Sequence, residues 1–102
     1  MGYSAAPLQI GPPSVSMDDR RKKLKFRAWR RGFREIDLIL GRFADRRLAE
    51  LDDAGLDAFE ALLEAPDQDV YLWITEEAEA PPEYDTPTLA LIRAFRFELN
   101  QD

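Results

Sequence analysis

Several residues able to bind a partner surround one glycine. They are Arg30, Arg31, Gly32, Phe33, Arg34, Glu35 and Asp37. Arg31 and Glu35 lie four residues apart, so their side chains would meet if the backbone between them is helical. Gly32 either ends a helix or, because it has no side chain, lets a partner or ligand approach its backbone closely. The local sequence alone favours the helix end.

The side chains that most often carry out catalysis are missing. The chain of 102 residues contains no cysteine and no histidine, which excludes disulfides, thiol nucleophiles and any Ser/His arrangement. Carboxylate pairs such as Glu60 with Glu64 remain, but acidic groups on a helix face are usually solvated. Gly32 and Gly41 are isolated and form no phosphate-binding loop. The composition therefore argues against an enzyme and against a metal site.

Charge is divided along the chain. Residues 18–47 hold 12 basic and 5 acidic side chains (net +7), and residues 48–102 hold 2 basic and 15 acidic ones (net −13), which together give −6. Such asymmetry indicates either that the basic part faces an anionic partner or that the two parts attract each other within the fold. The sequence leaves both interpretations open.

Residues 1–16 differ from the rest of the chain. They contain three prolines, two glycines and no charged side chain, so they resemble neither a secretory signal nor a mitochondrial presequence. No apolar run approaches the roughly 20 residues of a membrane span. We therefore expect a disordered leader over residues 1–16, no membrane insertion, and a cytoplasmic location in a bacterial cell.

Five helices must position the residues around Gly32. Hydrophobic periodicity and helix-end signals predict four of them over about residues 17–29, 33–44, 53–64 and 87–99, and a short fourth helix after Asp67 that includes Val70, Trp73 and Ile74. In the second, Ile36, Ile39, Leu40 and Phe43 follow the spacing i, i+3, i+4, i+7 and form one apolar stripe. With no strand pattern, the sequence predicts an all-α fold, a small bundle of five short helices forming one domain over residues 17–100.

The ends of the predicted helices carry recognisable signals. Asp52 or Asp53 is suited to cap the third helix, Pro66 to end it, and Asp67 to cap the fourth. Thr86 followed by a proline is typical of the start of a helix. The acidic residues and paired prolines of residues 76–85 predict an irregular linker.

The basic first helix also admits other functions. Its two aromatic residues, Phe26 and Trp29, would suit nucleic-acid or membrane-surface binding, although periodicity favours placing them in the core. The acidic remainder of the chain would repel DNA, whose phosphates dominate affinity. The basic first helix nevertheless keeps one alternative function open, that of a small DNA-binding or self-associating helical regulatory protein.

Several segments, in order and spacing, match one protein family. Residues 31–35 read Arg-Gly-Phe-Arg-Glu, which is an Arg-Gly-x-x-Glu motif. The apolar helix from Ile36 through Phe43 follows it. The later segments are the Leu-Asp-Ala-Phe-Glu-Ala-Leu-Leu-Glu helix of residues 56–64, Pro66-Asp67 and Leu72-Trp73-Ile74. Over about residues 20–74 the chain resembles the succinate dehydrogenase assembly factor family. These small helical proteins promote covalent attachment of FAD to the flavoprotein subunit.

The resemblance implies a chaperone-like assembly factor that is not an enzyme. It would bind the flavoprotein subunit of succinate dehydrogenase, and that of the related fumarate reductase, but no nucleic acid. Arg31, Gly32 and Glu35 carry over onto the motif and would form the contact surface, so Gly32 is interpreted as a point of close approach. Arg31 and Arg34 would make forked hydrogen bonds to a carboxylate or phosphate. The chain would bind no cofactor tightly and would act on FAD attachment by stabilising one conformation of the partner.

Overall fold

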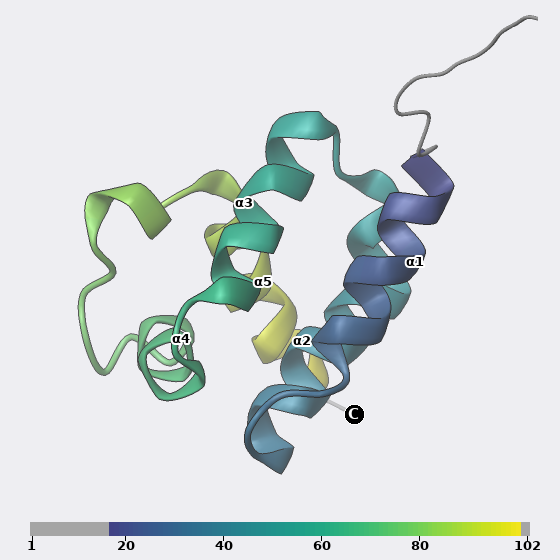
Figure 1. The fold of residues 1–102 in the computed structure, drawn as a ribbon. Helices are drawn as coiled ribbons and strands as arrows, with labels where there is room; N and C mark the ends of the chain where they lie inside the picture. Colours follow the sequence, from purple (N-terminus) through teal and green to yellow (C-terminus); the bar gives the residue numbers. More distant parts are fainter. Residues whose placement is uncertain (1–16, 101–102) are drawn as a thin grey trace, which may run out of the picture.

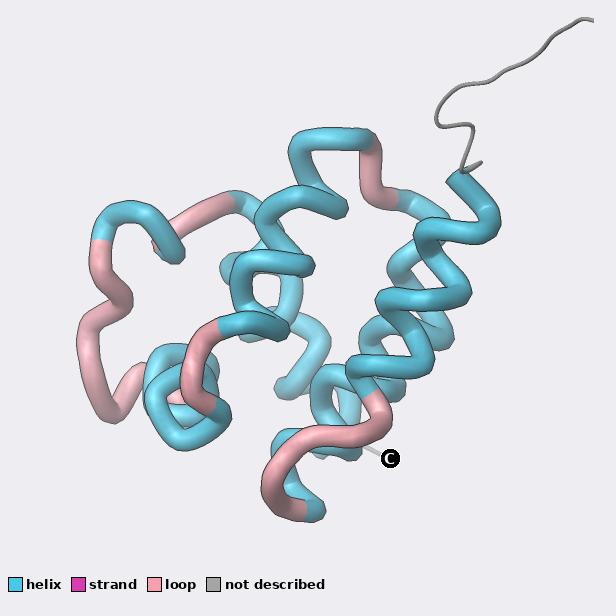
Figure 2. Tube along the Cα trace, in the orientation of Figure 1, coloured by secondary structure: helices cyan, strands magenta, loops and turns pink. Residues whose placement is uncertain are grey.

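The structure is a computed structural model that describes residues 17–100. This part of the chain is built from helices and loops and contains no β-strand (Figures 1 and 2). Its elements are α1 (Met17–Ala28), α2 (Arg34–Arg47), the 3₁₀ helix η2 (Leu48–Glu50), α3 (Asp53–Glu64), α4 (Asp67–Ile74), the 3₁₀ helix η3 (Pro82–Tyr84) and α5 (Pro87–Asn100). The prediction of an all-α fold with five helices is confirmed. The leader predicted over residues 1–16 lies outside the described residues.

The apolar stripe predicted for α2 forms the centre of the core. Ile36, Ile39, Leu40 and Phe43 are all buried. The Phe43 ring stacks on Phe59 of α3 and meets Phe95 of α5 edge-on, with 5.7 Å between ring centroids in both pairs. Burying one such ring contributes about 2–3 kcal/mol, and each aromatic pair adds about 1 kcal/mol. These three rings therefore fix α2 against both α3 and α5.

Two of the predicted caps and one predicted helix end are confirmed. At the start of α3, Asp52 Oδ1 accepts a hydrogen bond of 2.9 Å from the Gly55 N–H. At the start of α5, Thr86 Oγ1 accepts one of 3.3 Å from the Leu89 N–H. A cap of this kind stabilises a helix by about 1 kcal/mol. α3 ends at Glu64, two residues before the proline.

α1, α2 and the linker before α5 differ from the prediction. α1 ends at Ala28, so Gly32 lies within the loop of residues 29–33 and does not adopt the positive φ of a helix-ending glycine. α2 runs three residues further than predicted and continues into η2. The linker of residues 76–85 contains η3, whose first residue Pro82 has its φ restricted to a value that suits a helical turn. Tyr84 of η3 stacks on Trp73 with 4.8 Å between ring centroids.

Basic side chains of α1 pair with acidic side chains of α3. Arg20 lies 2.6 Å from Asp57 and 3.1 Å from Glu60, and Arg27 lies 3.6 Å from Glu60 and 3.8 Å from Glu64. The hydrogen bond to Asp57 raises the pKa of the Arg20 guanidinium above its ordinary value, although burial acts in the opposite direction. Attraction within the fold therefore accounts for part of the charge asymmetry.

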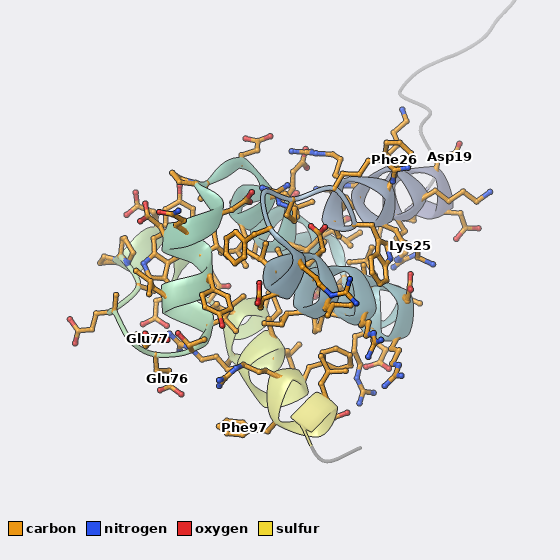
Figure 3. The ribbon with its side chains drawn as sticks, turned by 90° about the horizontal axis from the view of Figure 1, so that it is seen from below. Asp19, Lys25, Phe26, Glu76, Glu77 and Phe97 are labelled. Atoms are coloured by element: carbon orange, nitrogen blue, oxygen red, sulfur yellow. The ribbon has the colours of Figure 1, made fainter. Side chains whose placement is uncertain are left out.

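The prediction that both aromatic residues of the first helix pack in the core is wrong for Phe26. That side chain is 59% exposed and points outward from α1 (Figure 3), with the Arg30 guanidinium carbon 3.7 Å from its ring centroid. Trp29 is partly buried and lies directly over Gly41 of α2, where a Cβ atom would come within 2.3 Å of the indole ring. Gly41 therefore lets the indole of Trp29, the residue directly after α1, lie against the backbone of α2.

Gly41→Ala should destabilise the protein, although alanine is ordinarily the better helix residue by about 1 kcal/mol. The added methyl group would occupy space filled by the Trp29 indole, and overpacking of this kind costs about 1–3 kcal/mol. Urea denaturation followed by circular dichroism should show a lower midpoint. In a Trp29→Ala background the same substitution should be neutral or stabilising. An equal loss of stability in both backgrounds would contradict the proposed contact.

Candidate functional site

Arg31 reaches from the loop of residues 29–33 to the junction between α3 and α4. Its Nε donates to Asp67 Oδ1 at 2.8 Å, and its Nη2 lies 2.7 Å from the same oxygen. Nη2 also donates to the Leu63 carbonyl oxygen at 2.6 Å. Only 11% of the Arg31 side chain and 21% of the Asp67 side chain are exposed. The guanidinium is thus occupied within the protein, where it ties the loop to the end of α3 and the start of α4.

Carboxylates also bind the backbone of this loop. The Gly32 N–H donates to Asp67 Oδ2, and the Arg31 N–H donates to Asp37 Oδ1 at 2.6 Å. A Cβ atom on Gly32 would lie 2.8 Å from Asp67 Oδ2, so a side chain at this position would push away the carboxylate that binds it. In this structure Asp67 is the group that approaches Gly32 closely. A substitution at Gly32 therefore alters the loop as well as the surface.

The prediction that Asp67 caps the fourth helix is wrong. Pro66 occupies the capping position without a side-chain hydrogen bond, and Asp67 is the first residue of α4. Its carboxylate is turned toward Arg31 and Gly32, while its charge still complements the dipole at the helix start. Sequence reasoning did not place Asp67 in the site, because its contact with Arg31 spans 36 positions and leaves no local pattern. Two signals pointed to it: its position directly after a helix-ending proline, and the presence of Pro66-Asp67 among the segments that match the family.

Residues 31–33 are not helical, so the contact between Arg31 and Glu35 that a helical backbone would allow does not form in the described part of the chain. Arg34 and Glu35 instead begin α2 at the surface. Both are exposed, and neither side chain makes a hydrogen bond or an ion pair within the described part of the chain. Phe33 is partly buried and meets Tyr71 of α4 edge-on, with 5.4 Å between ring centroids.

Apart from Phe33, which packs on Tyr71, the predicted site residues divide into two groups. Arg31, Asp37 and the unpredicted Asp67 hold the loop in place through buried or partly buried contacts. Arg30, Gly32, Arg34 and Glu35 are exposed beside one another on the chain. The loop therefore combines a fixed backbone with charged side chains that can bind another molecule.

Within residues 17–100, no three side chains of the His, Cys, Asp or Glu type gather closely enough to hold a metal ion. No helix in the same range is long and apolar enough to cross a membrane.

Comparison with known proteins finds one family. Residues 22–96 match the family model described as the flavinator of succinate dehydrogenase. A protein of Dictyostelium discoideum named "Succinate dehydrogenase assembly factor 2, mitochondrial" is 40% identical over 86 residues, which cover 84% of this chain and 61% of that protein. Proteins of the same name from Scheffersomyces stipitis and Drosophila virilis are 39% and 31% identical, covering 66% and 79% of this chain and 45% and 52% of their own lengths. The chain therefore spans about half the length of these relatives.

The comparisons correct the predicted bacterial cytoplasmic location. These relatives are named mitochondrial and come from eukaryotes. The prediction rested on the absence of a recognisable targeting pattern in residues 1–16, and such an absence does not determine where a protein resides. The comparisons give no support to the alternative of a DNA-binding or self-associating regulator.

Asp67→Asn should lower the free energy of unfolding by about 2–3 kcal/mol, because it leaves the nearly buried Arg31 guanidinium without its charged partner. Chemical denaturation of the purified chain measures this loss. Glu64→Gln is the matched control, since Glu64 is 65% exposed and lies 3.8 Å from Arg27. A surface pair of this kind contributes at most about 1 kcal/mol. If Asp67→Asn were as stable as Glu64→Gln, the ion pair would not hold the loop.

Proposed function

We propose that the chain is an assembly factor that promotes covalent attachment of FAD to the flavoprotein subunit of succinate dehydrogenase, because it belongs to the family described as the flavinator of succinate dehydrogenase. The observation that carries the proposal is the match over residues 22–96, which includes the loop of residues 29–33 and the start of α2. There, the exposed side chains of Arg34 and Glu35 directly follow a loop whose backbone is held by Asp37 and Asp67. The resemblance extends the proposal to the flavoprotein subunit of fumarate reductase.

The contact surface in this proposal consists of exposed residues around the loop. Arg34 and Glu35 are its central members, because both lack partners within residues 17–100 and are free to bind charged groups of the flavoprotein. Arg30 and Gly32 extend the surface, and the partly buried Phe33 lies beside it. Arg31 and Asp37 act as positioning residues, since both bind groups within the protein.

The action we propose is conformational and not catalytic. With no histidine or cysteine, the chain would leave formation of the flavin bond to the flavoprotein and would hold no tightly bound FAD of its own. A binding protein shifts its partner between two conformations only if it binds one of them more tightly. A preference of about 1.4 kcal/mol changes the ratio of the two conformations tenfold. The surface around Glu35 would supply this preference.

Glu35→Gln should reduce covalent flavin on the succinate dehydrogenase flavoprotein toward the level seen without the chain. The change removes one exposed charge, and the Glu35 side chain makes no hydrogen bond or ion pair within residues 17–100 that the fold would lose. In-gel flavin fluorescence measures the bound flavin in a host whose own copy of the gene is deleted and replaced by each variant.

Glu83→Gln is the control for this experiment, because Glu83 is an exposed glutamate of η3, remote in sequence from the loop. It should restore flavin as well as the unmodified chain does. If both variants restored flavin fully at equal expression, the assignment of the contact surface would be wrong. Equal flavin with and without the unmodified chain would contradict the proposed function itself.

A further inference from the structure

A groove of about 320 Å³ begins at Glu35 and lies between α2, α4 and α5. On α2 its lining consists of Glu35, Leu38, Ile39 and Arg42. Across from them lie Tyr71 of α4 and Arg96 and Leu99 of α5. The groove thus has an apolar floor and charged groups from two helices.

The α2 side of the groove continues the proposed contact surface. Its four residues follow the spacing i, i+3, i+4, i+7, which places them along one face of the helix. Seven residues of α-helix extend about 10 Å along the axis. A partner that binds Glu35 therefore has to extend about 10 Å along α2 to reach Arg42.

The positive charge of this groove is not neutralised within residues 17–100. Arg42 and Arg96 make no hydrogen bond and no ion pair there, in contrast to Arg20 and Arg31. The Arg96 guanidinium carbon lies 5.8 Å from the ring of Phe97, which is 55% exposed and points away from the end of α5 (Figure 3). Two arginines against one glutamate give the groove a positive charge in a chain whose net charge is −6.

We propose that this groove binds a short acidic segment of the flavoprotein partner, an inference that rests on the proposed function. A groove about 10 Å long accommodates about three residues of extended chain. A carboxylate of the segment binds between Arg42 and Arg96, where charge-assisted hydrogen bonds are strong. An apolar side chain of the segment packs on Leu38 and its neighbours in the floor, and Glu35 accepts a hydrogen bond from a backbone N–H of the segment.

The lining favours a peptide carboxylate over a phosphate of free FAD. Glu35 at the start of the groove would repel the two charges of a pyrophosphate. A pyrophosphate also has no apolar part that could pack on the apolar floor. A peptide segment offers a carboxylate to the two arginines, an apolar side chain to the floor and a backbone N–H to Glu35. It therefore uses all three parts of the groove.

The test measures the affinity of the purified chain for the succinate dehydrogenase flavoprotein subunit prepared without covalent flavin, by titration calorimetry at several salt concentrations. Arg42→Ala and Arg96→Ala should each weaken binding about tenfold, the loss of one charge-assisted contact, and should reduce the dependence of affinity on salt. Arg42→Glu should weaken binding further. Arg46→Ala, on the same helix but outside the groove, should bind like the unmodified chain.

The outcomes separate this inference from the proposed function. If Arg42→Ala and Arg96→Ala bound as tightly as Arg46→Ala while Glu35→Gln bound weakly, the groove would be empty in the complex and only this inference would be overturned. If the unmodified chain did not bind the flavoprotein, the proposed function would fail and this inference with it. Binding of free FAD that is lost in Arg42→Ala would identify the flavin phosphates as the occupant, and this too would overturn the inference.

Discussion

The ion pair between Arg31 and Asp67 is the interaction on which the proposed site depends. It joins the loop before α2 to the start of α4, and the same two residues also bind the Leu63 carbonyl oxygen and the Gly32 N–H. Removing a guanidinium and a carboxylate from water is costly unless their hydrogen-bonding groups have partners. Here Arg31 donates to Asp67 and to the Leu63 carbonyl oxygen, and Asp67 also accepts from the Gly32 N–H. The ion pair thus fixes the direction in which the chain enters α2 and so the position of Arg34 and Glu35.

The arginines of this protein divide into a structural group and a group left for binding. Arg20 and Arg27 of α1 pair with acids of α3, and Arg47 pairs with Glu98 at 2.7 Å. These contacts bring the basic and acidic parts of the chain together, so part of the uneven charge is balanced within the fold. Arg34, Arg42 and Arg96 lack such partners among residues 17–100 and lie on or beside α2. Their positive charge is therefore available to an anionic surface.

Sequence reasoning predicted the fold well because its signals are local. The stripe of α2, the caps at Asp52 and Thr86, and the helix end before Pro66 each depend on residues within a few positions of one another. The site was predicted only in part, because its main contact joins Arg31 to a residue 36 positions away. Gly32 was interpreted as a helix end or a point of partner contact. Its close neighbour is Asp67, which no local pattern could reveal.

Reconstitution with purified proteins tests the central claim most directly. The succinate dehydrogenase flavoprotein subunit, prepared without covalent flavin, is mixed with FAD, and the covalent flavin formed over time is measured with and without an equimolar amount of this chain. The account predicts that the chain accelerates attachment severalfold or more. An equal rate in both mixtures, with the chain shown to be folded by circular dichroism, would contradict it.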